Sequence, residues 1–217
     1  MVILDCSMSG FARLKNMNLE NVSKIYVLVT HTHGDHISGI GLLIDYEYIV
    51  GKIPVVVVAP NEEVRNDLEF YLTRMEGISE DWYSLVSSTE LEVSWLRAAI
   101  PTTHVPTLAG RCFGYALRID GRDVVYTGDT NTLPSLAGFF RNVDLLLADG
   151  LFPAADWAEG KPHLSAELAA SLAAEAGAEA LVITHLNPVY PPEILLQEAR
   201  PKYPGVLLAS AGQVLPV

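Results

Sequence analysis

Apolar runs separated by polar, helix-like stretches extend along the whole chain. Ile25–Thr30 and Pro54–Val58 consist mostly of aliphatic and β-branched residues, which is typical of strands buried on both faces of a sheet. Shorter runs at Val2–Leu4, Leu145–Ala148 and Leu181–Thr184 predict further strands. Between the runs the pattern is helical, so strands and helices are expected to alternate.

Local signals predict where helices begin and where the chain turns. Asn61 is a typical N-cap for a helix over Glu62–Thr73. Ser165 has the same position before an alanine-rich helix that is expected to end at Gly177. Asp120-Gly121 predicts the turn of a β-hairpin.

Composition narrows the class of protein. With 217 residues, of which 50% are hydrophobic and 18% charged, we expect one compact globular domain over residues 1–217. The net charge of −12 argues against a broad nucleic-acid-binding surface. Two cysteines are too few for a disulfide scaffold. The N-terminal residues lack the features of a signal peptide, and no stretch is long and apolar enough to span a membrane, so a cytoplasmic protein is expected.

The hexapeptide His31-Thr32-His33-Gly34-Asp35-His36 follows directly on the strand predicted at Ile25–Thr30. Imidazole and carboxylate groups are ligands that zinc and similar divalent cations prefer. His31 and His33 are two residues apart and can share one ion, while Asp35 and His36 can hold a second. A polar loop is the alternative, but three of the six histidines lie in these six residues, so chance clustering is a poor explanation.

Four more candidate residues follow strand-like runs or precede a helix: His104, Asp129, His185, and His163 in His163-Leu164-Ser165. Taken singly, each of these residues is more often solvated or hydrogen-bonded to the backbone. Together with the hexapeptide they predict a metal site. Thr30, Thr127 and Thr184 are candidates for orienting the imidazoles, or are simply β-branched strand ends. Asp149 is a candidate for supporting the site from behind.

The order of these motifs is His-x-His-x-Asp-His, then His, then Gly-Asp-Thr, then Thr-His. This order resembles the metallo-β-lactamase-fold hydrolase superfamily. The resemblance implies an α+β fold, a four-layered αββα sandwich with two metal ions at one edge. It implies that His31, His33 and His104 hold the first ion, that Asp35, His36 and His185 hold the second, and that Asp129 bridges them. Two zinc ions are expected, although a His/Asp site also accepts manganese and iron.

The resemblance also implies a hydrolase in which a hydroxide shared by the two ions is the nucleophile and Asp35 orients it. The segment around His163 is similar to an element of the phosphodiesterase branch, which includes tRNA 3′-end processing nucleases and small cyclic-phosphate phosphodiesterases. In that branch this histidine protonates the leaving oxygen. The expected function is therefore hydrolysis of a small phosphodiester with His163 as general acid. Alternatively, His163 is a surface residue at a helix start.

The chain departs from these relatives in three respects, one of which is Ala211 at a position where an Asp-Gly pair is common. It has no counterpart of the long basic arm that grips tRNA, which favours a small-molecule substrate. The hairpin that usually precedes the strand at Val2–Leu4 is missing, so we expect either a homodimer that covers the exposed sheet edge or a truncated start. Two other functions stay open: a thioesterase or lactonase similar to glyoxalase II on the same metal pair, and a non-catalytic metal-binding module.

Overall fold

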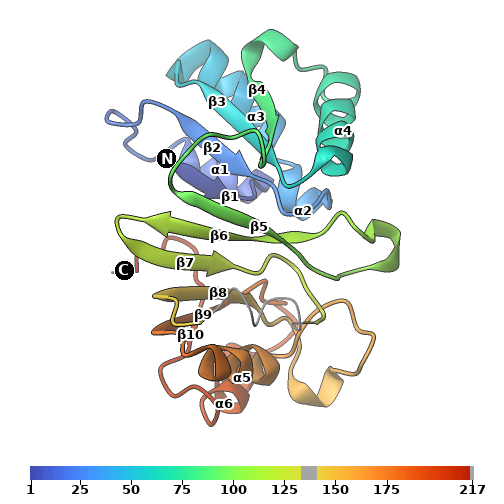
Figure 1. Ribbon diagram of the computed structural model, residues 1–217, viewed down its shortest axis with the longest axis vertical. Helices are drawn as coiled ribbons and strands as arrows, with labels where there is room; N and C mark the ends of the chain where they lie inside the picture. The colour runs from blue at the N-terminus through green and yellow to red at the C-terminus, as the bar shows by residue number, and fades with distance from the viewer. Residues whose placement is uncertain (133–140, 216–217) are drawn as a thin grey trace. The chain divides into compact units, whose positions relative to one another are not determined.

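The computed structural model describes residues 1–132 and 141–215. The chain divides into two compact units, Met1–Glu92 and Val93–Val217. Each unit contains one β-sheet with helices packed against it (Figure 1).

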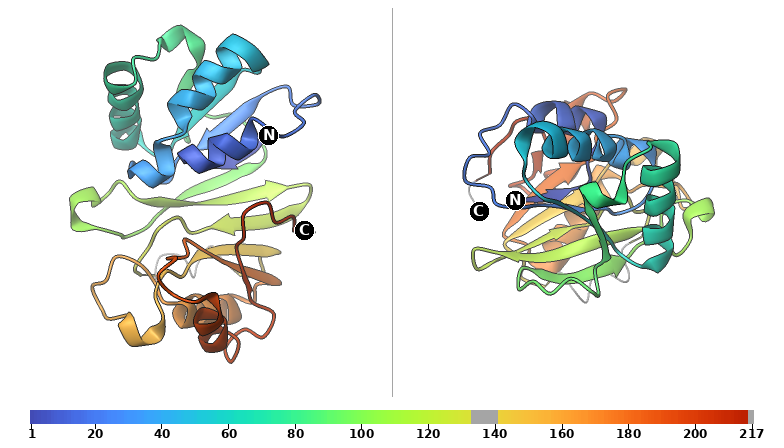
Figure 2. Two further views of the ribbon diagram at one scale, coloured as in Figure 1. Left: turned by 180° about the vertical axis from the view of Figure 1, so that it is seen from behind. Right: turned by 90° about the horizontal axis from the view of Figure 1, so that it is seen from above.

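The first unit is built on a parallel sheet with the strand order β1-β2-β3-β4. Its strands are β1 (Val2–Leu4), β2 (Ile25–Leu28), β3 (Val55–Ala59) and β4 (Ser84–Ser87), and its helices are α1 (Met8–Leu14), α2 (Gly34–Ile37), α3 (Ile40–Tyr46) and α4 (Glu62–Phe70). Alternate residues of β2 and β3 form one core with apolar side chains of α1, α3 and α4, so these helices cover one face of the sheet (Figure 2). β1 is an edge strand, and pairing of this edge in a homodimer stays a prediction.

The helix predicted over Glu62–Thr73 begins as expected, because the Asn61 side chain accepts a hydrogen bond from the backbone N–H of Val64 at 3.0 Å. Its α-helical part ends earlier, at Phe70, and continues as a π-helical turn over Tyr71–Met75. The hydroxyl of Thr73 donates to the carbonyl of Glu69 at 2.7 Å. A side chain that bonds the carbonyl four residues back competes with the regular helical bond and distorts the helix there.

The second unit is built on a mixed sheet with the order β10-β9-β8-β7-β6-β5. Its strands are β5 (Leu96–Pro101), β6 (Phe113–Ile119), β7 (Arg122–Tyr126), β8 (Leu145–Asp149), β9 (Ala180–Thr184) and β10 (Leu207–Leu208), and its helices are α5 (Ala166–Ala176) and α6 (Pro192–Ala199). β5, β6 and β7 pair antiparallel, whereas β7 to β10 pair parallel. Both helices share one core with side chains of this sheet.

Local signals in the second unit are confirmed. Asp120 and Gly121 have φ values of 51° and 85°, and two left-handed residues are what a tight hairpin turn requires. The Ser165 hydroxyl accepts a hydrogen bond from the backbone N–H of Leu168 at 3.2 Å and caps α5. Gly177 ends that helix with a φ of 65°.

The strand directions place polar residues at two sheet edges. In the first unit the parallel strands β1 and β2 are followed by Asp5 and by Thr30-His31, at the same edge. In the second unit β5, β7, β8 and β9 run in one direction. Their carboxyl ends lead to His104, Asp129, Asp149 and His185. The carboxyl edge of such a sheet is the usual place for a ligand site.

Gly114 of β6 provides a test of this packing. A Cβ at this position would lie 2.5 Å from the backbone oxygen of Tyr126 and 2.8 Å from that of Thr127. Because backbone atoms of a central strand cannot move aside cheaply, Gly114→Ala is expected to reduce the free energy of unfolding by about 1–3 kcal/mol. Gly10→Ala in α1 is the control, since its Cβ meets only a serine side chain at 3.4 Å. Urea unfolding in which both variants match the wild type would contradict this prediction.

Candidate metal centre

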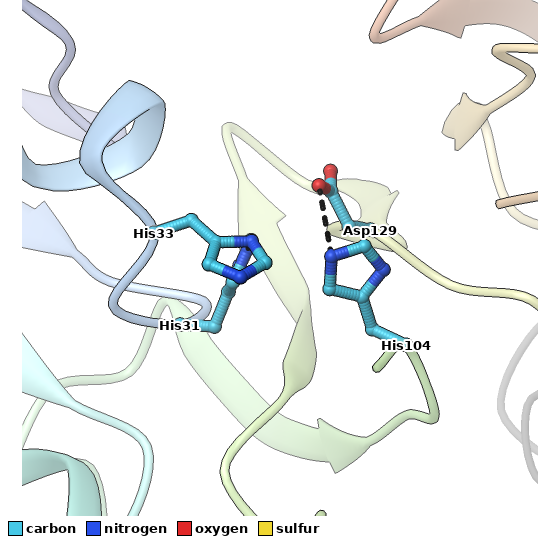
Figure 3. A group of neighbouring side chains, drawn as sticks. All are labelled: His31, His33, His104 and Asp129. Atoms are coloured by element: carbon cyan, nitrogen blue, oxygen red, sulfur yellow. Dashed lines mark hydrogen bonds and ion pairs between the residues drawn. The ribbon is translucent and has the colours of Figure 1, made fainter. Parts of the chain in front are cut away.

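The hexapeptide begins in the loop after β2 and continues into α2, and it brings two imidazoles together. Nε2 of His31 lies 3.0 Å from Nδ1 of His33 (Figure 3). Nδ1 of His31 faces the Thr30 hydroxyl at 3.0 Å, so Nε2 is the nitrogen turned toward His33. Two nitrogens bound to one tetrahedral zinc ion lie about 3.4 Å apart, because each Zn–N bond is about 2.0–2.1 Å long. The arrangement of His31 and His33 therefore fits a shared ion.

His36 is buried, and its ring is oriented by the carboxylate of Asp5, the residue that follows β1. Its Nδ1 lies 2.8 Å from Oδ2 of Asp5. The same carboxylate accepts hydrogen bonds from the backbone N–H and the hydroxyl of Thr30, at 2.7 and 2.9 Å. A carboxylate that accepts the Nδ1 proton leaves the Nε2 lone pair available for a metal ion. Oδ2 of Asp35 lies 3.6 Å from this Nε2, so these two residues fit a second ion.

Asp5 is a site residue that the sequence analysis missed. The available signal was its position, because it is the first polar residue after the strand at Val2–Leu4, as Thr30 is after the strand at Ile25–Leu28. Its φ of 56° is a left-handed conformation, which aspartate tolerates better than most residues do. Its backbone N–H donates to the carbonyl of Leu28 at 2.9 Å, which ties it to β2.

In the second unit Asp129 is the carboxylate around which the candidate ligands gather. Its Oδ1 lies 3.0 Å from Nδ1 of His185. Its Oδ2 lies 3.8 Å from Nε2 of His104, the pair joined by a dashed line in Figure 3. Nδ1 of His104 donates to the carbonyl of Pro162 at 2.8 Å. In the neutral ring this bond places the proton of His104 on Nδ1 and the lone pair on Nε2, the nitrogen that faces Asp129.

His163 lies in the same cluster, with potential ligand atoms within 4.8 Å of those of Asp129 and His185. The residue is only 8% exposed, so it is not the surface residue of the alternative interpretation. Its Nδ1 lies 2.8 Å from Oδ2 of Asp149. Its ring stacks on that of His185, with the centroids 4.6 Å apart.

Asp149 is completely buried at the end of β8. It supports the site, as the sequence suggested, through its hydrogen bond with His163. Its carboxylate also accepts hydrogen bonds from the backbone N–H groups of Thr130 at 3.0 Å and Leu151 at 3.3 Å. Burial raises the pKa of the Asp149 carboxyl, and the hydrogen bond with His163 opposes that shift. The carbonyl of His163 in turn accepts a hydrogen bond from the indole N–H of Trp157 at 3.0 Å.

The three threonines have different roles. The hydroxyl of Thr30 contacts the imidazole of His31, which is a candidate ligand. The hydroxyl of Thr127 accepts from the backbone N–H of Asp149, and that of Thr184 donates to the carbonyl of Ala148. Thr127 and Thr184 therefore tie neighbouring strands together rather than orient an imidazole.

The residues of each unit fit divalent metal ions. Within the first unit the candidate ligands are His31, His33, Asp35 and His36, and within the second they are His104, Asp129 and His185. His31, His36 and His104 each have one ring nitrogen held by a hydroxyl, carboxylate or carbonyl partner, which is the usual arrangement around metal-binding histidines. The two cysteines do not belong to this donor set. Burial and the nearby carboxylates of Asp5 and Asp129 raise the pKa of the Cys6 and Cys112 thiols to about 11, so both stay protonated at neutral pH.

Comparison with known proteins identifies the family. The profile of the β-lactamase superfamily domain matches residues 1–186. The chain belongs to the metallo-β-lactamase superfamily. The probable metallo-hydrolase YhfI of Bacillus subtilis is 27% identical over 196 residues, which cover 87% of this chain and 77% of that protein. Its crystal structure matches with a TM-score of 0.80 at 21% identity, covering 99% of this chain and 87% of the other.

Two further proteins are similar to this chain. Ribonuclease Z of Methanosarcina mazei is 39% identical over 93 residues, or 41% of this chain, and the match spans only 30% of that protein. The crystal structure of a diphosphatase from the PhnP family matches with a TM-score of 0.74 at 21% identity, covering all of this chain and 79% of the other. The predicted metallo-β-lactamase fold is thus confirmed. None of the described helices has the length and apolar character needed to cross a membrane.

Proposed function

We propose that this metallo-β-lactamase-fold hydrolase cleaves a small phosphodiester, with two divalent ions and with His163 as the group that protonates the leaving oxygen. The observation that carries the proposal is the buried His163–Asp149 pair, which lies beside Asp129 and His185. Hydrolysis of an ester with a weakly acidic alcohol is faster when the leaving oxygen receives a proton, and a buried, oriented imidazole can supply it.

The proposed ligands are those that the motif order implies. His31, His33 and His104 would hold one ion. Asp35, His36 and His185 would hold the other ion, and Asp129 would be a ligand of both. When bound, such ions lower the pKa of a coordinated water and stabilise the negative charge that develops on the phosphoryl oxygens. Each unit supports this assignment separately. In the first unit Asp5 fixes the orientation of the His36 ring, and in the second the Pro162 carbonyl fixes that of the His104 ring.

His163 would move one proton in the reaction. As a general acid His163 would act in its imidazolium form, in which both ring nitrogens carry a proton. The Asp149 carboxylate holds the proton on Nδ1, so the proton that His163 delivers is the one on Nε2, and the ring is left as neutral imidazole. As the bond between phosphorus and the leaving oxygen breaks, this proton passes to that oxygen and the product departs as a neutral alcohol. An alkoxide is a strong base and a poor leaving group, so this step matters most for unactivated diesters.

The names of the relatives support a phosphoryl substrate. The ribonucleases Z and the diphosphatase are named for cleaving bonds at phosphorus. The net charge of −12 favours a small substrate over a long polyanion, because a nucleic acid needs clustered Lys and Arg side chains.

Metal removal and reconstitution test this proposal. The protein is stripped with a chelator, reloaded with zinc, manganese or iron, analysed for metal content, and assayed with bis(p-nitrophenyl) phosphate. We expect two ions per chain, no activity in the stripped protein, and recovery with at least one of the three metals. Hydrolysis of a thioester or lactone without hydrolysis of the diester would contradict the proposal and favour acyl chemistry. Two ions without activity on any of these substrates would favour a binding module.

A further inference from the structure

A cavity of about 330 Å³ adjoins the candidate ligand His104 within the second unit. Most of its lining comes from residues 102–110, which follow β5, and the rest comes from Asn131 and Gly160. Asn131 follows Asp129 by two residues, and Gly160 precedes His163 by three. The volume is near the lower end of the range of small-molecule sites, roughly 300–1,000 Å³.

The chemistry of the lining is mostly apolar and, apart from the His104 imidazole, uncharged. Val105, Pro106 and Leu108 supply aliphatic surface. The Thr103 hydroxyl donates to Oδ1 of Asn131 at 2.8 Å, and Nδ2 of Asn131 donates to the carbonyl of His104 at 3.1 Å. The hydroxyl of Thr102, the third uncharged polar side chain of the lining, donates to the carbonyl of Asp129 at 3.5 Å. These three side chains are therefore engaged with each other or with the backbone, and the cavity offers little to a charged group.

The nearest cations in the sequence are directed elsewhere. The Arg111 guanidinium donates to the carbonyl of Thr107 at 2.8 Å. The Lys161 ammonium lies over the ring of Phe152, 5.4 Å from its centroid. Neither residue lines the cavity. A second phosphate or a carboxylate placed there would be desolvated without a partner, which is costly.

The cavity is also connected to the reacting groups. The hydrogen bond from His104 Nδ1 to the Pro162 carbonyl joins the segment after β5 to the loop that carries His163. A group bound in the cavity therefore lies against His104 and next to that loop.

We propose that this cavity binds the uncharged, largely apolar organic group on one ester oxygen of the substrate, and so selects phosphodiesters with a compact neutral substituent over those that carry a second anion. This inference rests on the proposed function for its substrate and on the cavity lining for its selectivity.

Two esters with the same leaving group test the selectivity. Phenyl 4-nitrophenyl phosphate and 4-carboxyphenyl 4-nitrophenyl phosphate differ only in the charge of the retained group. We expect kcat/KM to be at least tenfold higher for the neutral ester, because the charged one would bury an unpaired carboxylate. Ala109→Trp places a large side chain at an exposed lining residue and is expected to reduce this ratio to about one. Thr107→Trp is the matched control, since Thr107 is exposed on the same segment, does not line the cavity, and is expected to keep the wild-type ratio.

Direct binding separates this inference from the proposed function. In methyl-labelled protein, phenol is expected to shift the NMR signals of Val105 and Leu108, whereas 4-hydroxybenzoate is not. The phenol shifts should disappear in Ala109→Trp and persist in Thr107→Trp. If the protein hydrolyses no diester, the proposed function fails while these shifts still test the cavity. Equal shifts with both phenols, or an unchanged kcat/KM ratio in Ala109→Trp, would overturn the selectivity.

Discussion

His163→Ala is expected to lower kcat about 10²- to 10⁴-fold for a diester with a weakly acidic leaving alcohol, such as methyl phenyl phosphate. The loss should be much smaller for bis(p-nitrophenyl) phosphate, because p-nitrophenolate leaves readily without a proton. The physical reason is that the variant keeps the rest of the site but lacks the Nε2 proton that Asp149 orients. Steady-state kinetics on the two esters, with the metal-loaded variant and wild type, measure this difference.

Metal content distinguishes a general acid from a ligand at this position. His163 has potential ligand atoms within 4.8 Å of those of Asp129 and His185, so it is close enough to share an ion with them. If it acts as the acid, the variant retains two ions per chain. Loss of one ion, or an equal loss of activity on both esters, would contradict the role proposed for His163.

Asp5→Asn is expected to weaken the binding of one of the two ions about 10- to 100-fold while the protein stays folded. The new amide keeps an oxygen for Thr30 but turns an N–H toward His36 Nδ1, where the carboxylate oxygen lies at 2.8 Å. Nδ1 must then accept a hydrogen bond, and the ring proton moves to Nε2, the nitrogen needed by the metal. Asparagine also tolerates the left-handed φ of 56° at this position.

Competition with a chelator at limiting metal concentration measures the two affinities. Asp81→Asn is the control, because Asp81 is exposed in the first unit and lies outside the hexapeptide. Circular dichroism should be unchanged in both variants. Two ions held as tightly in Asp5→Asn as in the wild type would show that His36 does not depend on Asp5.

Features that depend on neighbours in the chain were predictable from the sequence. Asn61 and Ser165 cap their helices through residues three positions later, and Asp120-Gly121 turns its hairpin by its own backbone conformation. The residue types of the candidate ligands and their positions after strands also follow from local pattern. The end of α4 at Phe70 was less accessible, because it depends on whether the Thr73 side chain bonds to the helix backbone or to water.

Features that join distant segments were decided by the tertiary structure alone. Asp5 and His36 are 31 residues apart, and Asp149 and His163 are 14 apart. No short-range pattern specifies such pairs. The first depends on the parallel register that sets Leu4 beside Leu28, and the second on the loop between β8 and α5 that returns His163 to the buried end of β8. The sequence by itself determined which groups could hold metal, since ligand chemistry belongs to residue types. For His36, His104 and His163, which ring nitrogen is available was decided by packing, because the partner of Nδ1 comes from another strand or loop.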